Sequence, residues 1–334
     1  MLTSTVMLLN AQNPDYMKMV EYATKAPSGH NTQPWIFEIG DAFIRIHPDF
    51  SYGLPMVDAD NRELYISLGC ALENLCIAAN EFGYKTNATV QKTDTAFIIN
   101  VELEKEEGLK NSLFEQIERR QTNRNVYNNQ IIHPDTIKTL KKVPCEKDTK
   151  WYLFEKEDTV FSQLTKFVMQ GNEVQMKDKQ FKNELLSWMR YNDKQVENQK
   201  NGLSYKMFNS PSMPKKIGKF IVGCFLKPKT QNKTDLEKIK SSSHLALFTT
   251  TNNTPEGWIA TGQSLERFLL TATGLDIACA YLNQPCEVKE LAQKIQYELL
   301  EDNEFPVIIL RLGFASPAPY SLRKPIDEVI KKTD

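Results

Sequence analysis

The segment GCALENL at residues 69–75 recurs in altered form as GQSLERF at residues 262–268. In the first copy, apolar residues from Leu64 to Phe82 are spaced three and four apart, which is the periodicity of a helix face. Apolar residues also fall on its other faces, so we predict a helix that is buried on nearly all sides. The second copy, roughly residues 258–273, predicts a similar helix, and Gly83 and Gly274 are expected to end the two. Two such helices in one chain indicate a duplicated unit.

The regions around these helices alternate between helical and extended patterns. Asn13-Pro14 is typical of a helix start and predicts a helix that runs to about Lys25. Further helices are predicted near residues 158–170 and 180–190. Apolar patterning predicts strands at residues 35–39, 43–47, 96–103, 151–154, 244–250 and 306–312. Long gaps separate most of the strands, which favours an α+β sandwich over a regular series of βαβ units.

The composition is that of a globular protein with almost no net charge. The 334 residues contain 41 Lys and Arg against 42 Asp and Glu. This balance argues against a nucleic-acid partner, because nothing supplies a bulk positive field. No apolar run is long enough to span a membrane, and the short apolar run at residues 6–9 does not resemble a signal peptide. The six cysteines and four histidines show no metal-binding spacing, and we expect a cytoplasmic protein.

The segment from Lys206 to Lys240 differs from the rest of the chain. It has nine Lys against two acidic residues, interleaved with Met, Phe, Ile and Val side chains. Three interpretations are a lid over a site, a helix on a membrane surface, and a solvated insertion whose apolar residues dock on the body. We favour docking or a lid, with no membrane partner, because Pro211, Pro214, Gly218 and Gly223 are expected to break a long amphipathic helix.

Two polar motifs are candidates for a ligand site. APSGHNTQPW at residues 26–35 lies between a helix end and a strand, and such a loop offers backbone amides, a hydroxyl and carboxamides to a planar heterocycle. RRQTNR at residues 119–124 places Arg120 and Arg124 on one side of a helical turn, a geometry that can hold a phosphate. Taken singly, each motif has a simpler explanation, namely a polar turn and a solvated basic helix face.

Together, the two motifs resemble the nitroreductase superfamily of FMN-binding oxidoreductases. The chain is most similar to the fused tandem (Acg-type) members, in which one polypeptide supplies both halves of what is usually a homodimer. The likeness extends to REL at residues 62–64, LNQP at 282–285, LRLGF at 310–314 and SLRKP at 321–325. It implies a nitroreductase-like fold of two fused halves that form an intramolecular pseudo-dimer. The first half is expected at residues 1–118 and the second at 119–334, with a lid-like insertion near 190–240.

The resemblance also implies one FMN per chain, bound between the two halves. By this analogy, Arg120, Thr122 and Arg124 hold the phosphate, ribityl and pyrimidine end of FMN, and Arg323 or Lys324 closes on the phosphate. The other implied cofactor-binding residues are Pro27, Ser28, Gly29, Asn31, Asn74, Asn283 and Gln284. Each motif occurs once, and Arg267 replaces Asn74 in the repeat. We therefore expect one complete site and one degenerate site.

The implied activity is hydride transfer from NAD(P)H through FMN to a nitro compound, quinone or similar small acceptor by a ping-pong route. Because the flavin carries this chemistry, no catalytic side chain is expected, and His30 is expected to be structural. We expect a monomer, because fusion already forms the internal dimer. One alternative is a non-enzymatic flavin-binding or storage protein with its lid closed over FMN. The other is a peripheral membrane protein with no redox role.

Overall fold

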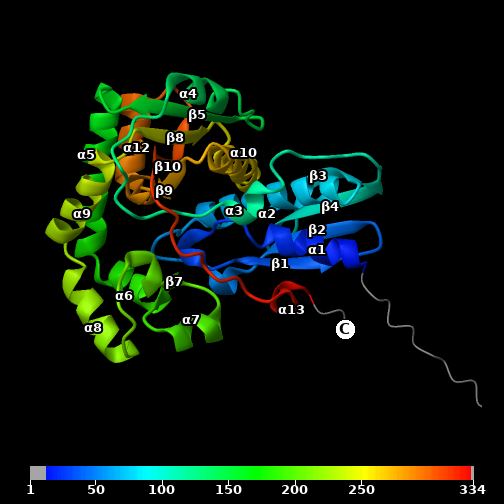
Figure 1. Cartoon of the computed structure of the whole chain (residues 1–334), viewed down its shortest axis with the longest axis horizontal. Coiled ribbons are helices and arrows are strands. Elements are labelled where there is room, and N and C mark those ends of the chain that lie inside the picture. The colour runs from blue at the N-terminus through cyan, green and yellow to red at the C-terminus, as the bar shows by residue number, and fades with distance from the viewer. Residues whose placement is uncertain (1–12, 332–334) are drawn as a thin grey trace, which may run out of the picture.

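Two four-stranded antiparallel sheets lie on either side of two central helices (Figure 1). This computed structural model describes residues 13–331, so the apolar run at residues 6–9 lies outside it. The central helices are α2 (Arg62–Glu81) and α10 (Pro255–Gly274), the two that the repeat predicts. The first sheet has the order β1-β2-β4-β3 and the second β5-β8-β10-β9. Their strands are β1 (Trp35–Ile39), β2 (Phe43–Pro48), β3 (Tyr84–Lys92), β4 (Phe97–Lys105), β5 (Thr149–Glu155), β8 (His244–Thr250), β9 (Ala278–Tyr281) and β10 (Phe305–Gly313). The predicted α+β class is confirmed.

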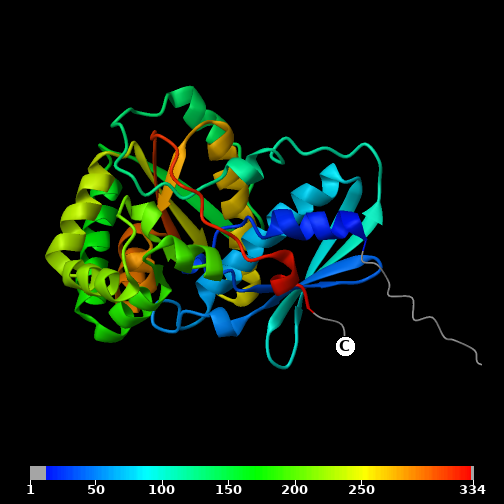
Figure 2. The same ribbon diagram turned by 60° about the horizontal axis from the view of Figure 1, so that its bottom comes forward.

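The other helices cover the sheets or extend from them. They are α1 (Pro14–Ala23), α3 (Gln116–Arg119), α4 (Pro134–Leu140), α5 (Thr159–Lys177), α6 (Lys179–Trp188), α7 (Asp193–Gln199), α8 (Lys215–Phe225), α9 (Pro228–Lys240), α11 (Gln284–Glu287), α12 (Lys289–Leu299) and α13 (Ile326–Val329). Short strands β6 (Met189–Arg190) and β7 (Leu203–Ser204) pair in parallel. Apolar residues of α5, α9 and α12 share one core with β8 and β10. After β10 the chain crosses to the first sheet, where Ile330 bridges Phe37 of β1 (Figure 2).

Most elements that the sequence predicts are present. Two strands of the four-stranded sheets, β3 and β9, were missed, as were the two-residue strands β6 and β7. All six predicted strands correspond to observed ones, and the Asn13 side chain accepts from the Asp15 N–H at the start of α1 as an N-cap. Strand β3 is an edge strand that is largely exposed, so its sequence TNATVQK lacks the alternation of a half-buried strand. Strand β9 has only four residues, too few for a pattern.

The prediction that glycines break the basic segment is wrong, because α8 is continuous through Gly218 and Gly223. Gly218 is buried against Tyr191, and a Cβ at this position would lie 2.5 Å from the Tyr191 ring. Its role is therefore close packing. Helix α10 ends at Gly274 as expected, although the left-handed residue beyond it is Asp276, with a φ of 56°. Gly83 follows α2 with a φ of 74°, as expected of a glycine that ends a helix.

Helices α2 and α10 touch at the two repeat glycines. A Cβ added to Gly69 would lie 2.1 Å from the Ile259 carbonyl oxygen, and one added to Gly262 would lie 2.1 Å from the Ile66 carbonyl oxygen. Each isoleucine precedes the glycine of its own helix by three residues, so the contacts are reciprocal. The Cys70 thiol also donates to the Gly262 carbonyl at 3.2 Å. Only glycine at both positions allows the two backbones to approach so closely.

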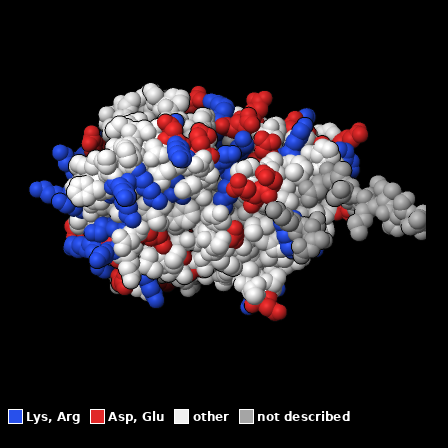
Figure 3. Space-filling model, turned by 90° about the horizontal axis from the view of Figure 1, so that it is seen from below, with Lys and Arg blue, Asp and Glu red and all other residues white. Residues whose placement is uncertain are grey.

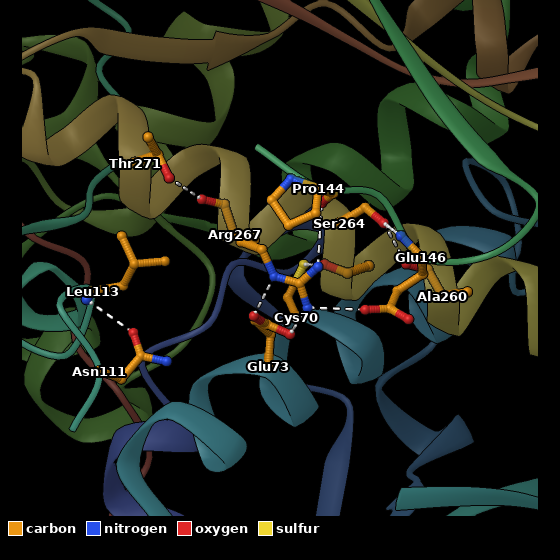
Figure 4. A network of polar contacts seen from close by, with 11 residues as sticks. Cys70, Glu73, Asn111, Leu113, Pro144, Glu146, Ala260, Ser264, Arg267 and Thr271 are labelled. Carbon is orange, nitrogen blue, oxygen red and sulfur yellow. Dashed lines mark hydrogen bonds and ion pairs between the residues drawn. The ribbon is translucent and has the colours of Figure 1, made fainter. Parts of the chain in front are cut away.

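Arg267 clamps α10 to α2 and to the chain before β5 (Figure 4). Its Nε and Nη2 atoms bind the two carboxylate oxygens of Glu73, each at 2.8 Å, and Nη2 also binds Glu146 at 2.9 Å. In the repeat, Arg267 occupies the position of Asn74, and Glu266 that of Glu73. Glu266 lies beside Asn74, just as Glu73 lies beside Arg267. The two equivalent pairs of repeat positions are therefore neighbours across the two helices. The change from Asn to Arg at this position supplies a bidentate ion pair.

Replacing Gly69 by alanine tests the helix crossing. We expect Gly69→Ala to lower the free energy of unfolding by about 1–3 kcal/mol, because the new methyl group forces the two backbones apart. Gly223→Ala in α8 is the matched control, since its Cβ would meet only Leu186 at 3.9 Å. It is expected to raise stability by about 0.5–1 kcal/mol through the better helix propensity of alanine. Urea unfolding measures both, and equal effects would contradict the proposed role of Gly69.

Candidate functional site

A cavity of about 1150 Å³ lies at the junction of the central helices, the second sheet and the segment formed by α5–α9. Its wall includes ten of the twelve residues that the sequence predicts for a cofactor site: Pro27, Ser28, Gly29, Asn31, Arg120, Thr122, Arg124, Asn283, Gln284 and Arg323. Residues far apart in sequence thus converge on one space. The other two, Asn74 and Lys324, do not line it.

The loop at residues 27–33 forms one wall and is held in an unusual backbone conformation. His30, Asn31 and Gln33 have φ angles of 48°, 56° and 56°, in the left-handed region that non-glycine residues rarely adopt. The Ser28 hydroxyl accepts from the Gln33 N–H at 3.0 Å. Such strain persists only where surrounding contacts enforce it, and it is concentrated at functional sites.

Two remote segments supply these contacts. The Asn31 carboxamide donates to the Gly202 and Leu322 carbonyl oxygens at 3.3 and 3.2 Å, and the Gly202 N–H donates to the Asn31 carbonyl at 3.1 Å. The Gln33 carboxamide donates to the Lys200 carbonyl at 2.9 Å and accepts from the Lys324 N–H at 2.8 Å. The insertion and the C-terminal segment therefore both fix the loop.

Arg124 is the cavity residue whose charge is least compensated. Its Nη1 atom is inaccessible to solvent and has no hydrogen-bond partner among residues 13–331. Burial lowers the pKa of Arg124 to about 10, and the nearby Arg311 guanidinium adds to this effect. None of the groups that shift this pKa is a carboxylate. A guanidinium placed in this way favours an anionic or electron-rich ligand in the cavity.

Arg120 and Arg323 form a second cationic region of the wall. Arg323 donates to the carbonyl oxygens of Thr24, Lys25 and Ala26 at 2.7, 2.9 and 3.2 Å, which holds it at the end of the α1 segment. The pKa of Arg323 is lowered to about 9, mainly by burial and in addition by the nearby positive charge of Arg120. The Nε of Arg120 lies 3.2 Å from the fully buried Glu266 carboxylate. Arg323 therefore adds a positive charge beside the Arg120–Glu266 pair.

His30 belongs to the loop at residues 27–33 and lies near Arg124. Its Nε2 atom is buried and has no hydrogen-bond partner within the described part of the chain. Burial lowers the pKa of His30 to about 4, and the charge of Arg124 lowers it further in the same sense. The imidazole is therefore neutral at physiological pH and contributes no positive charge to the cavity. Its Nε2 atom remains available for a hydrogen bond to a ligand.

A pair of buried carboxyl groups, which the sequence interpretation missed, faces the cavity from α2 and α11. Glu63 accepts from the Asn283 carboxamide at 3.0 Å, and Glu287 accepts from Gln175. The two carboxyl groups are close enough to influence each other's ionisation. Burial raises the pKa of Glu63 to about 8, and the charge of Glu287 raises it as well. At neutral pH the pair therefore retains a proton. Glu63 lies within the motif REL, and Glu287 follows the motif LNQP by two residues, which was the available signal.

The outer wall of the cavity is apolar and comes from the end of α5, from α6 and from the insertion. Its side chains belong to α5, α6, the loops that follow, and α8: Met176, Phe181, Leu185, Met189, Leu203, Met207, Ile221, Val222, Phe225 and Leu226. Flexible methionines among them suit a surface that adapts to ligands of different shape. Residues of the basic segment thus contribute to the wall of the site.

Asn74 and Lys324 have other surroundings. Asn74 is fully buried, and neither atom of its carboxamide has a hydrogen-bond partner among the residues described. The Lys324 amino group donates to the Gln33 carbonyl at 3.2 Å and lies 3.1 Å from the centre of the Tyr52 ring. Lys324 therefore supports the loop from behind.

Over nearly its whole length, the chain is similar in sequence to proteins named as NAD(P)H nitroreductases. Two Mycobacterium tuberculosis proteins, from strains CDC 1551 and H37Rv, are each named "Putative NAD(P)H nitroreductase". Each is 23% identical to this chain, over 97% of this chain and 94% of its own length. No family model matches the chain. These matches bear out the general resemblance to nitroreductases, and they do not test the likeness to the fused tandem members.

Solved structures are similar over a smaller part. One is an FMN-bound nitroreductase from Bacteroides fragilis, which is 14% identical to this chain. The alignment includes 67% of this chain and 100% of the nitroreductase, with a TM-score of 0.40. The FMN-dependent nitroreductase NfnB from Mycobacterium smegmatis, solved with NADPH, is 12% identical with the same coverages and a TM-score of 0.42. Each of the two alignments leaves about a third of this chain uncovered.

Replacing Glu63 by glutamine tests the carboxyl pair. The pKa of Glu63 is raised from 4.5 to about 8, so the folded chain binds this proton more tightly than the unfolded chain. The wild-type protein should therefore lose stability as the pH rises across that range. Glu63→Gln can still accept from Asn283 and donate to Glu287, and we expect a smaller loss.

Urea unfolding at both ends of this pH range measures the difference. Glu298→Gln on the exposed side of α12 is the control and should leave the pH dependence unchanged. An equal loss of stability in wild type and Glu63→Gln would show that the pair does not hold a proton.

Proposed function

We propose that this chain is an FMN-dependent NAD(P)H oxidoreductase of nitroreductase type, which reduces a nitro compound, quinone or similar small acceptor. The observation that carries the proposal is the uncompensated guanidinium of Arg124 in a cavity that also holds Arg120, Arg323 and the strained loop at residues 27–33. The names of the curated relatives support the choice of NAD(P)H as the electron donor.

The residues present fit a flavin mononucleotide. Arg323 and Arg120 supply positive charge for its phosphate, and Thr122 between Arg120 and Arg124 offers a hydroxyl to the ribityl chain. Arg124, with its buried unpartnered Nη1, suits the electron-rich pyrimidine end, where reduction places negative charge. The loop at residues 27–31 and the carboxamides of Asn283 and Gln284 complete the polar wall.

Bound FMN would supply the hydride-transfer chemistry between NAD(P)H and the acceptor. The chain's own residues have three tasks in this proposal. Arg124 stabilises negative charge in a site of low polarity. The carboxyl pair of Glu63 and Glu287 holds a proton at the cavity wall. The apolar wall from α6 and α8 excludes water from the reacting groups.

We also infer that residues 1–118 and 119–334 form two halves of an intramolecular pseudo-dimer, in a chain that is monomeric and binds one FMN. The reciprocal contacts of Gly69 and Gly262 support this organisation. The loop at residues 27–33 comes from the first half and Arg120, Arg124 and Arg323 from the second, and each of these elements occurs once. One complete cofactor site per chain is the expected result.

A non-enzymatic flavin-binding protein is the second candidate. It is favoured by the position of the insertion, since Met207, Phe208 and the inner face of α8 line the same cavity as the arginines. A wall that stays in place over bound FMN would keep a nicotinamide away from it. Both candidate functions require that the protein binds FMN.

Removing the arginines tests FMN binding. We expect Arg124→Ala and Arg323→Ala each to weaken FMN binding about 10- to 100-fold, because each deletes a charge-assisted contact. Flavin absorbance per chain after dialysis, and fluorescence titration with FMN, measure the loss. Arg45→Ala, which breaks an ion pair with Glu38 on the first sheet, is the control and should retain the flavin. Full flavin content in both cavity variants would contradict the assigned site.

Anaerobic reduction separates the two candidates. An oxidoreductase is expected to lose its flavin absorbance when NADH or NADPH is added to the holoprotein. A storage protein would stay yellow with both nucleotides and bleach only with dithionite. A flavin-free preparation that cannot be reconstituted with FMN would contradict both.

A further inference from the structure

Helix α8 presents a stripe of apolar side chains to solvent. Ile217, Phe220, Ile221 and Phe225 are exposed, with Phe220 at 74% and Phe225 at 61%. Together with the exposed Cys224, they recur at spacings of three and four residues, which places them on one face of the helix. Two phenylalanines exposed to this degree on one helix indicate a surface that binds something apolar.

The opposite side of α8 already attaches the helix to the protein. Gly218 is buried against Tyr191, and Leu226 packs with Met176 and Phe181 of the cluster beneath it. Val222, one turn before Leu226, is partly buried and lines the cavity. The exposed stripe is therefore a second apolar face, which nothing in residues 13–331 covers.

Lysines surround this stripe without acidic partners. Lys215, Lys216 and Lys219 lie within α8, Lys227 and Lys229 follow it, and all five are exposed. No acidic residue occurs from position 198 to 234. The view of the molecule from below shows Lys and Arg side chains gathered at the end that carries α8 and α9 (Figure 3). Exposed apolar residues bordered by lysines match a helix that lies in the interface of an anionic bilayer.

We propose that α8 docks the protein on an anionic lipid surface, with its apolar stripe inserted among the lipids and its lysines on the phosphates. The helix has 11 residues and is about 16 Å long, which suits a helix lying flat in the interface. No helix within the described residues could cross a membrane. The association is therefore peripheral.

A second copy of the chain fits this surface less well. Pairing two copies of α8 would bring their lysines together, and the 37 residues from 198 to 234 contain no carboxylate to neutralise them. Lipid phosphates supply that charge, at a gain of roughly fivefold in partitioning for each lysine near the surface. Charge complementarity thus favours lipid over self-association.

Vesicle flotation of the full-length holoprotein tests the proposal. We expect it to float with vesicles of phosphatidylcholine and phosphatidylglycerol, and not with phosphatidylcholine alone. The double variant Ile217→Ser, Phe220→Ser should partition at least about tenfold less, because neither residue lines the cavity and both face solvent. The matched control replaces two equally exposed side chains elsewhere, Ile131→Ser with Tyr297→Ser, and should float like wild type.

A lysine pair tests the charge contribution separately. Lys216→Ala with Lys219→Ala should lower partitioning roughly 25-fold, at about fivefold per lysine. Lys289→Ala with Lys294→Ala on α12 is the control and should have no effect. Three outcomes would overturn the proposal: no flotation with anionic vesicles, equal flotation with neutral vesicles, or equal effects of the α8 variants and their controls. Conversion of a dimer to a monomer by the stripe variant, without vesicle binding, would assign the stripe to self-association instead.

Discussion

The contact between α2 and α10 leaves no room for a side chain at Gly69 or Gly262, and the rest of the molecule is arranged around it. Because the two backbones touch, each sheet packs on its own side of one continuous core. The loop at residues 27–33 and the segment at 120–124 are then brought to the same space, although about ninety residues separate them. A wider crossing would separate the two groups of residues that form the cavity wall.

Charge is distributed unevenly around the cavity, because different structural elements supply its cationic, carboxyl and apolar side chains. Arginines arrive from the segment after α3 and from the C-terminal crossing, the carboxyl pair arrives from the start of α2 and from α11, and the insertion adds apolar side chains. A ligand that is anionic at one end, aromatic in the middle and able to exchange a proton suits all three. The arrangement therefore selects for ligand chemistry through separate elements, each held by different contacts.

The sequence predicted the elements with strong periodicity and the motifs with unusual residue types. The repeated helices and the loop at residues 27–33 could be identified because their patterns are local. The paired arginines do line the cavity, but the helical turn predicted for them is wrong: α3 ends at Arg119, and the segment that follows is extended, with Thr122 in a β-bridge to Cys279. Strand β3 could not, because an exposed edge strand needs no apolar alternation. The carboxyl pair was missed because Glu63 and Glu287 are 224 positions apart and become a pair only by folding. The continuity of α8 was missed because Gly218 stabilises the helix by packing against Tyr191, which composition does not reveal.

Ile221 and Phe225 belong to two surfaces at once, since each is exposed to solvent and also lines the cavity. A single turn of helix thus separates the interior of the site from whatever lies outside it. A cavity ligand that repositions these side chains changes the affinity of the stripe for its partner. By linkage, a partner on the stripe changes the affinity of the cavity for its ligand by the same free energy. The two surfaces are thermodynamically linked through shared side chains, so natural variation at either residue changes both together.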